Sequence, residues 1–387
     1  MSIIAVPSPV PSASDDAESL RKALQVRHGR MVTTRVASAG WRADKGALTR
    51  ILCRRTAAQR AAIRRAYAFL YREPLLNCFR YKLSRHCLLS LDFWKAMILW
   101  TMDPAERDAN LVHEALKKKQ RDETYYMSVL IEVSCACTPD HLVAVRRAYL
   151  ALFGCSVEED VAASPAIQEP LKKASQDHTA THNLISCSDK FREFRQGDFF
   201  FFSLIDRCWC VSDLQMLVRL VSSYRYEGDE CVVDMDVVRM EASQLAEAIK
   251  KKKQPRGEDE VVRIVTTRSK SQLRATFQRY REDHGSDIAE DIDSHCIGQF
   301  GRMLKTAVWC LTSPEKHFAE VIRHSILGLG TYEDMLTRVI VSRAEIDMRH
   351  IREEYKVRYK TTVTRDVVGD TSFGYKGFLL ALVGRED

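Results

Sequence analysis

The sequence lacks several features that would assign it to a familiar class of protein. No apolar stretch, including the one around Phe199–Phe202, approaches the roughly 18–20 residues that a membrane-spanning helix needs. Its first residues have neither a positively charged start nor a long apolar segment, so we expect no secretory signal. It also contains no HExxH zinc motif and no GxxxxGK[ST] phosphate loop. These absences argue against an integral membrane protein, and no motif points to an enzyme.

The cysteines and the net charge give only mild indications. None of the 12 cysteines forms a CxxC pair, and Cys135-Ala-Cys137 and Cys208-Trp-Cys210 have the wrong spacing for a common zinc site. We therefore expect reduced structural thiols in a cytoplasmic protein. The net charge of +7 is compatible with binding to anionic surfaces but is not diagnostic. Hydrophobic residues make up 45% of the 387 positions, which is enough for a sizeable core.

One pattern of apolar residues, arginines and a closing tyrosine occurs four times. The copies are ILCRRTAAQRAAIRRAY (51–67), EVSCACTPDHLVAVRRAY (132–149), IVTTRSKSQLRATFQRY (264–280) and VIVSRAEIDMRHIREEY (339–355). Within a copy, apolar residues recur at helical spacing, as Met348, Ile351 and Tyr355 do, and no segment shows sustained period-two alternation. The sequence therefore predicts an all-α protein built from four repeats of several short helices.

Two segments interrupt the repeats. The closing tyrosines are 82, 131 and 75 residues apart, and long structureless insertions are uncommon inside a compact unit. Our hypothesis is that residues 26–39 and 174–215 are sequence not selected for this fold, such as translated intron; a functional surface loop is the alternative. A transcript spliced from Gln25 to Gly40 and from Lys173 to Met216 would support it. Peptides from both segments in the natural protein would contradict it.

The fourth repeat contains a loop whose residues suit a calcium ion. Glycines alternate in the stretch Ile-Leu-Gly-Leu-Gly-Thr (326–331), so the carbonyls of Ile326, Gly328 and Gly330 can turn toward one point. Asp370, which lies in the next interhelical loop, can add a bidentate carboxylate. A phosphate oxygen from a lipid would complete the set of oxygens that calcium prefers.

Neighbouring residues extend this site. Thr331, with Asp334 three residues later, is placed as an N-cap, so a helix is expected to begin directly after it. Thr331 and Glu333 form a candidate weaker site beside the first. Leu329 would project at the tip of the loop, where it is suited to contact acyl chains.

At these residues the chain resembles the annexins, most of all the plant branch. The likeness is carried by LWTMDPAERDANL (99–111), LVSSYRYEGDE (220–230), RIVTTRSKSQ (263–272) and GLGTYEDMLTRVIVSRAEID (328–347). The resemblance implies four repeats of about five helices each, forming one curved disc that binds anionic phospholipid through calcium. It implies a peripheral protein of the cytoplasm that associates reversibly with membranes. It divides the chain into a tail (1–16) and repeats 1 to 4 (17–103, 104–228, 235–313 and 314–387).

By the same resemblance, the first three repeats depart from the calcium-binding pattern. In repeat 1, Arg42 replaces the second glycine and Lys82 stands at the acid position. Repeat 2 has Asp-Glu-Thr (122–124) at its loop, and repeat 3 has Lys-Gln-Pro (253–255), with His295 at the acid position. Only repeat 4 is expected to bind calcium. Trp41 can insert into a membrane interface or pack in the core, and both interpretations stay open.

Basic residues lie next to the loops that have lost calcium ligands. They are Lys117, Lys118 and Lys119 before the loop of repeat 2, and Lys250, Lys251, Lys252 and Lys253 at the loop of repeat 3. Near an anionic membrane each would contribute about 1 kcal/mol, which salt would screen. We therefore expect calcium-independent, salt-sensitive binding to acidic vesicles. The alternative is an ordinary solvated face.

Other partners have less support. Arg263-Ile264-Val265 resembles a tripeptide linked to actin binding in plant annexins, which reads Ile-Arg-Ile there, but Ile264 is expected to be buried in a helix. No nucleic-acid partner is expected. Cys135 and Cys310, which match cysteines of plant relatives, are expected to be buried thiols. A second interpretation of the whole chain stays open, namely a helical-repeat adaptor that binds proteins or nucleic acid through its basic face, with a vestigial calcium site.

Overall fold

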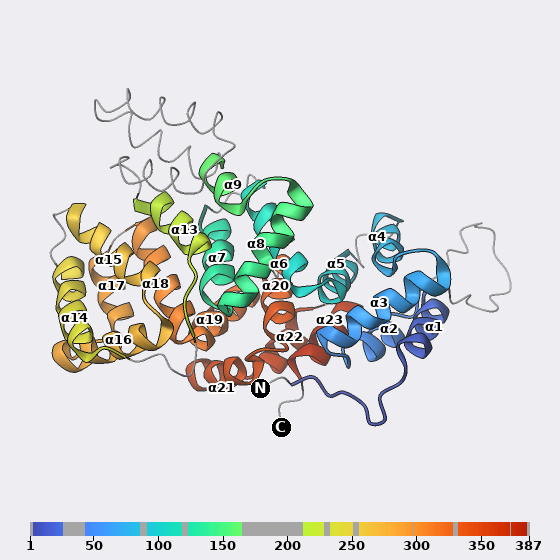
Figure 1. The fold of residues 1–387 in the computed structure, drawn as a ribbon. Coiled ribbons are helices and arrows are strands. Elements are labelled where there is room, and N and C mark those ends of the chain that lie inside the picture. The colour runs from blue at the N-terminus through green and yellow to red at the C-terminus, as the bar shows by residue number, and fades with distance from the viewer. Residues whose placement is uncertain are drawn as a thin grey trace. The chain divides into compact units, whose positions relative to one another are not determined.

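The protein is all-α in the part of the chain that the computed structural model describes. That part comprises residues 3–25, 43–85, 91–117, 123–164, 212–227, 233–250, 255–296, 298–327, 332–371 and 373–384. Within these ranges no strand occurs, so the predicted fold class is confirmed (Figure 1). Residues 26–39 and 174–211 lie outside them, whereas residues 212–215, which we assigned to the second surplus segment, form the first turn of a helix.

The helices of the described ranges form four successive groups of five. The first group is α1 (Ala13–Leu24), α2 (Lys45–Leu52), α3 (Ala57–Tyr71), α4 (Leu75–Arg85) and α5 (Leu91–Thr101). The second is α6 (Pro104–Lys117), α7 (Glu123–Cys135), α8 (Pro139–Phe153), α9 (Val157–Ala163) and α13 (Ser212–Ser222). The third is α14 (Met235–Lys250), α15 (Pro255–Thr267), α16 (Lys270–His284), α17 (Ile288–His295) and α18 (Gln299–Thr312). The fourth is α19 (Pro314–Ile326), α20 (Glu333–Arg343), α21 (Met348–Tyr359), α22 (Val363–Asp370) and α23 (Phe373–Val383).

The third helix of each group shows how the sequence sets the limits of a helix. In three groups a hydroxyl side chain before the helix accepts the backbone N–H three residues later, which satisfies a donor that has no partner inside the helix. These capping residues are Thr56, Thr138 and Ser269. All four third helices end at a residue with left-handed backbone, which is Gly154, Gly285, Arg72 or Lys360. This conformation stops the helix and redirects the chain toward the fourth helix.

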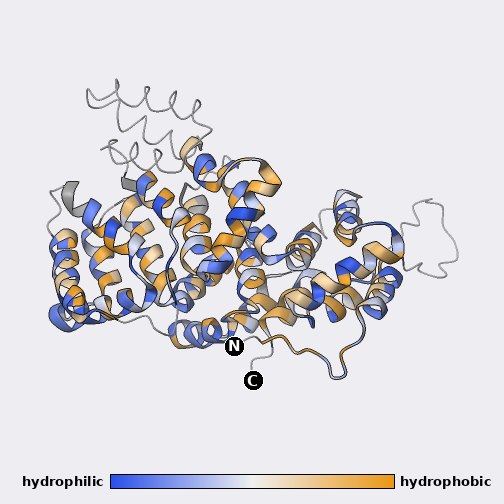
Figure 2. Ribbon diagram, viewed as in Figure 1, coloured by the Kyte–Doolittle hydropathy of each residue, from blue (hydrophilic) through white to orange (hydrophobic). Residues whose placement is uncertain are grey.

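The apolar residues of the repeats form the core. Hydrophobic and hydrophilic residues alternate around the helices with the period of an amphipathic helix (Figure 2). The closing tyrosines of the four repeats have no exposed surface, and the same holds for Ile264 and for Met348 and Ile351 of α21. The tyrosines are Tyr67, Tyr149, Tyr280 and Tyr355. The helical spacing in the sequence therefore identified the buried faces correctly.

The chain divides into two compact units that do not follow the order of the repeats. Unit 1 contains residues Met1–Arg107 and Glu315–Asp387, and unit 2 contains Asp108–Pro314. In unit 1, α2 packs against α23 and α20 packs against α5. In unit 2, α7 packs against α18 and α13 against α15. Each unit is therefore held together by the second helix of one group meeting the fifth helix of the other.

The buried tyrosines make a polar contact that recurs along the chain. In three groups the hydroxyl donates a hydrogen bond to an aspartate eleven residues later, on the fourth helix. The pairs are Tyr149 with Asp160 at 2.5 Å, Tyr280 with Asp291 at 2.7 Å and Tyr355 with Asp366 at 2.7 Å. Burial raises the pKa of all three hydroxyls, so each remains a donor. The contact links the third helix of a group to the fourth.

The first group carries a variant of this contact. Eleven residues after Tyr67 stands Cys78, whose Sγ lies 3.5 Å from the tyrosine Oη. The carboxylate is supplied instead by Glu73, six residues after the tyrosine, which lies 3.5 Å from the Arg21 guanidinium. Arg21 also donates to the Tyr67 hydroxyl at 3.2 Å. The first group therefore also has a carboxylate near its closing tyrosine, but Glu73 supplies it and the residue eleven positions after the tyrosine does not.

Moving the acid from position 73 to position 78 should recreate, in the first group, the tyrosine–aspartate hydrogen bond of the other three groups. Cys78→Asp alone places a second carboxylate beside Glu73, whereas Glu73→Ser with Cys78→Asp copies the arrangement of Ser286 and Asp291. We expect the double variant to be about 0.5–1.5 kcal/mol more stable than Cys78→Asp alone. Urea denaturation followed by circular dichroism would measure this difference. Equal stability of the single and double variants would contradict the expectation.

Candidate functional site

The loop between α19 and α20 is closed by backbone hydrogen bonds at both of its ends. α19 ends at Ile326, and the N–H of Leu327 still donates to the carbonyl of Arg323 at 3.0 Å. The N–H of Tyr332 donates to the carbonyl of Ser325 at 2.9 Å. α20 begins at Glu333 after Tyr332, without a side-chain cap. The placement of Thr331 as the N-cap is therefore wrong by one residue, because the carbonyl of Tyr332 accepts the first helical hydrogen bond, from the N–H of Leu336 at 3.0 Å.

A buried tyrosine of α23 ties this loop to the last interhelical junction. The hydroxyl of Tyr375 donates to the carbonyl of Glu333 at 3.1 Å and lies 2.5 Å from the hydroxyl of Thr337. Burial raises the pKa of Tyr375, with the carboxylates of Asp92, Glu333 and Asp334 adding to the effect, so the hydroxyl stays protonated. The first turns of α20 and α23 are therefore in contact. The loop before α20 and the junction between Asp370 and α23 consequently lie at the same end of unit 1.

A charged group from the first repeat lies beside the start of α20. The ammonium of Lys95 on α5 is 3.0 Å from an Asp334 carboxylate oxygen and 3.9 Å from one of Asp92. All three side chains are partly exposed, so this pairing contributes modestly to stability. It nevertheless places acidic groups from two repeats at the end of the unit where the loop lies.

The predicted calcium ligands are only partly within the described residues. Ile326 is the half-buried last residue of α19, and Glu333 is the half-buried first residue of α20. Asp370 is the last residue of α22, and its side chain lies outside the described part. Gly328, Leu329, Gly330 and Thr331 also lie outside it, as does Trp41. The hydrogen bond from Tyr375 to the Glu333 carbonyl therefore links the start of α20, which follows the loop, to the start of α23, which follows Asp370.

Of the seven lysines predicted to contact the membrane, two lie within the described residues. Lys117 is the exposed last residue of α6, and Lys250 is the exposed last residue of α14. Lys250 has its ammonium 3.7 Å from Asp291, the aspartate that accepts from Tyr280. The remaining five lysines lie outside the described ranges. They are Lys118, Lys119, Lys251, Lys252 and Lys253.

At the acid position of the third repeat the side chains are bound within their own repeat. Nδ1 of His295 lies 2.9 Å from the carbonyl of Asp291, one turn earlier in the same helix. The nearby Asp293 forms an ion pair with Lys305 of α18. Among the residues that the structure describes, no group of three or more His, Cys, Asp or Glu side chains is arranged to hold a metal ion. The predicted site lies mostly outside those residues, since it consists of backbone carbonyls of the loop at 326–331 and the side chain of Asp370.

Sequence reasoning missed two contacts at this end of unit 1. Tyr375 and Thr337 are 38 positions apart, and no short motif relates them. Lys95 and Asp334 are 239 positions apart and meet only because α5 packs against α20. The available signal was the helical spacing of α20 and α23, which indicates their buried faces but not their mutual contact.

A family model and curated sequences match the chain. The model, described as "Annexin", matches residues 33–87, 240–307 and 317–382. Annexin D3 of Arabidopsis thaliana is 37% identical over 387 residues, which is 99% of this chain and 99% of that protein. Annexin-like protein RJ4 of Fragaria ananassa is 38% identical over 97% of this chain and 96% of that protein.

Solved structures match as well. The structure of annexin III superposes with a TM-score of 0.74, at 25% identity over 99% of this chain and 97% of that one. In the described residues, no helix has both the length and the apolar character that crossing a membrane requires.

Proposed function

Because this chain belongs to the annexin family, we propose that it is a peripheral membrane protein that binds anionic phospholipid in response to calcium. The calcium site is the loop at residues 326–331 of the fourth repeat together with Asp370. The first three repeats bind no calcium, because their loops lack the glycine pair or the acid.

The hydrogen bond from Tyr375 to the Glu333 carbonyl is the observation that carries this proposal. It holds the first turns of α20 and α23 together. The loop before α20 ends two residues before Glu333, and Asp370 precedes Tyr375 by five residues. The proposed site thus combines backbone carbonyls from one loop with a carboxylate from another, which is the donor combination that calcium takes; the contact between α20 and α23 supports this pairing.

The local backbone also fits a hard cation. The last carbonyls of a helix have no partner within that helix, and Ile326 is the last residue of α19. The carbonyl of Ser325 accepts a hydrogen bond from the Tyr332 amide, which closes the loop. Calcium held by these protein oxygens would supply the positive charge that attracts a lipid phosphate. Glu333, on the first turn of α20, is the candidate carboxylate of the weaker adjacent site with Thr331.

The proposed membrane contacts are side chains in or near the loops of the repeats. Leu329 lies between the two glycines of the loop, so it is the apolar side chain that would enter the acyl region. Trp41 is the corresponding candidate in repeat 1. The lysines near the loops of repeats 2 and 3 supply the basic contacts, of which Lys117 and Lys250 are exposed at the ends of α6 and α14.

A calcium titration with phosphatidylserine vesicles tests the proposal. We expect sedimentation of the protein with the vesicles to rise with calcium and to reverse when a chelator is added. Neutral phosphatidylcholine vesicles serve as the control and should bind little protein. Calcium-insensitive sedimentation at every salt concentration would contradict the proposal and favour the adaptor interpretation.

The basic residues predict a second component of binding. In chelator at low salt we expect measurable binding to the same acidic vesicles, because each lysine near the surface contributes about 1 kcal/mol. Raising the salt toward physiological strength should remove most of this component, since the Debye length then falls to about 8 Å. Sedimentation in chelator across a salt series measures it. Absence of binding at low salt would refute the role of the lysines.

A further inference from the structure

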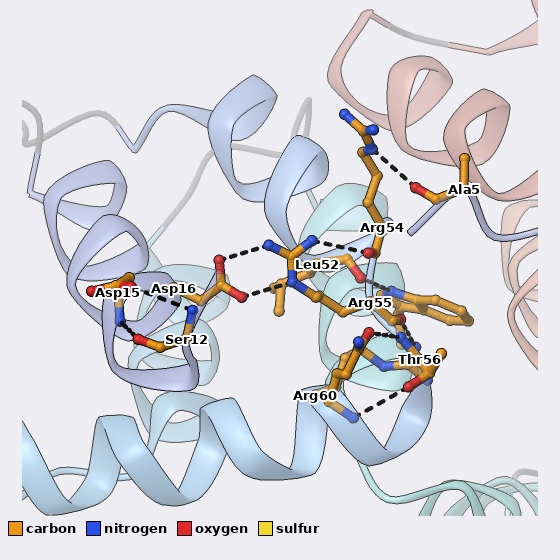
Figure 3. Close-up of polar contacts among 11 residues, drawn as sticks. Ala5, Ser12, Asp15, Asp16, Leu52, Arg54, Arg55, Thr56 and Arg60 are labelled. Atoms are coloured by element: carbon orange, nitrogen blue, oxygen red, sulfur yellow. Dashed lines mark hydrogen bonds and ion pairs between the residues drawn. The ribbon is translucent and has the colours of Figure 1, made fainter. Parts of the chain in front are cut away.

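The N-terminal segment runs along unit 1 and lines one side of an open cavity. This segment, residues 3–11, is called the arm below. Arg54, just after α2, donates from Nε to the carbonyl of Ala5 at 3.1 Å (Figure 3). Ile3 packs against Gly384, where a Cβ atom would lie 3.3 Å from its Cδ1. The arm is thus held at two points, and between it, α1 and α2 lies a cavity of about 340 Å³.

The acidic side chains of the cavity are already engaged. Arg55 binds Asp16 through two hydrogen bonds of 2.7 and 2.9 Å, and both side chains are buried (Figure 3). The Asp15 carboxylate accepts the backbone N–H of Ser12 at 3.3 Å at the start of α1. The ion pair uses Arg55 and Asp16, and the Asp15 carboxylate keeps its negative charge beside the other two arginines. With three arginines and two aspartates, the lining has a net charge of +1.

Those two arginines, Arg50 and Arg54, have donors to spare. Both are exposed and lie four positions apart at the end of α2. Neither forms an ion pair with a residue that the structure describes, and Arg54 uses only Nε for Ala5. Two guanidinium groups that face one cavity can hold the oxygens of a phosphate group in paired hydrogen bonds.

The rest of the wall suits a small organic group. Pro7 and Pro11 of the arm and Ile51 of α2 present apolar surface to the cavity. Its volume lies near the lower end of the range of about 300–1,000 Å³ that is typical of small-molecule sites. A bare phosphate ion would leave most of this space unfilled. A phosphate monoester with a compact apolar group would fill it and contact both kinds of surface.

The cavity lies at the end of α2 away from the proposed membrane loops. Lys45, the first residue of α2, approaches Gly374 of α23, which is next to Tyr375. Arg50 is in the last turn of α2, and Arg54 stands two residues beyond the end of that helix. A ligand here is therefore expected to come from solution and not from a membrane surface.

We propose that the cavity between the arm, α1 and α2 binds a soluble phosphate monoester, with its phosphate on Arg50 and Arg54. The apolar group lies against Pro7, Pro11 and Ile51. This site is separate from the calcium loop, so the proposal does not depend on the proposed function. It assigns the arm a role as one wall of a binding site.

Isothermal titration calorimetry with phenyl phosphate tests the site in the full-length protein. We expect saturable binding, weaker by at least about tenfold in the Arg50→Gln/Arg54→Gln variant because two charge-assisted contacts are lost. Ala47→Phe, which fills the cavity without changing the charge, should weaken it similarly. The matched control is Arg239→Gln/Arg349→Gln, which removes two exposed arginines elsewhere and should leave binding unchanged.

Each other outcome overturns the proposal. Absence of saturable binding, or equal binding by the cavity variants, removes the site. Loss in the control as well would mean that binding follows net charge alone. Displacement of phenyl phosphate by calcium-free phosphatidylserine vesicles would make the ligand a lipid headgroup. Loss of calcium-dependent vesicle binding in the Arg50/Arg54 variant alone would make these arginines membrane contacts and would also overturn the proposal, whereas failure of the unaltered protein to bind vesicles with calcium would contradict the proposed function alone.

Discussion

Replacing Asp370 with alanine is expected to raise the calcium concentration for half-maximal vesicle binding by at least about tenfold. The reason is that the proposed site has a single carboxylate, while its other protein ligands are neutral carbonyls. Removing that carboxylate takes away both a bidentate ligand and the negative charge that favours a divalent cation. Sedimentation with phosphatidylserine vesicles across a calcium series measures the change.

The matched control is Asp293→Ala. Asp293 lies near the acid position of repeat 3, on α17, and pairs with Lys305, but its repeat has no glycine pair at the loop. Its removal should leave the calcium series unchanged. A thermal unfolding curve for each variant verifies that the fold is retained. If Asp370→Ala binds vesicles with unchanged calcium dependence, the site assignment fails and the adaptor interpretation gains.

The largest expected effect on stability comes from Asp16→Ala. Arg55 and Asp16 are only 4% and 5% exposed and form a bidentate ion pair between α1 and the end of α2 (Figure 3). Arg55 also donates to the carbonyl of Arg54 at 3.0 Å. Removing the carboxylate leaves a buried guanidinium without its counter-charge, which costs about 3–5 kcal/mol. Urea denaturation followed by circular dichroism measures this loss.

Two further variants separate the charge effect from lost packing. In Asp16→Leu/Arg55→Met both charges are replaced by apolar groups, so the double variant should be more stable than Asp16→Ala. Glu18→Ala removes an exposed acid from the same helix and should change stability by no more than about 0.5 kcal/mol. A double variant as unstable as Asp16→Ala would show that the loss comes from packing and not from the unpaired charge.

The local parts of the fold could be predicted from the sequence because they depend on near neighbours. The spacing of Met348, Ile351 and Tyr355 defines one helix face, and all three are fully buried. The burial of Ile264 was expected on the same basis and is confirmed. Cys135 and Cys310, expected to be buried thiols, are both buried. In each case the period of a helix was sufficient, since it says which residues point away from water.

The contacts between distant elements could not be predicted in this way. The pairing of the first repeat with the fourth depends on how α2 meets α23 and how α5 meets α20. The sequence places the cap at Thr331, one residue early, because the residue at the actual cap, Tyr332, has a side chain that a capping rule does not recognise. The Tyr375 hydroxyl reaches the Glu333 carbonyl across 42 positions. Such contacts depend on tertiary packing, for which a single sequence gives no local signal.

The surplus-segment hypothesis and most of the calcium loop stay predictions. Residues 26–39 and 328–331 lie outside the described part of the chain. What the structure adds to the candidate site is the contact between the first turns of α20 and α23, which Tyr375 makes. The glycine spacing identified the loop, but only the packed helices relate that loop to the position of Asp370.

The division into two units has a consequence for the order in which the chain can fold during synthesis. Unit 2 is one continuous segment, residues 108–314, so all of its helices are available once that stretch has left the ribosome. Unit 1 combines residues 1–107 with residues 315–387, and α2 and α5 must wait for α20 and α23. Contacts over such sequence separations form slowly, because a long loop must first be closed. The segment made first therefore completes its packing last, and its apolar faces remain open while unit 2 is being translated.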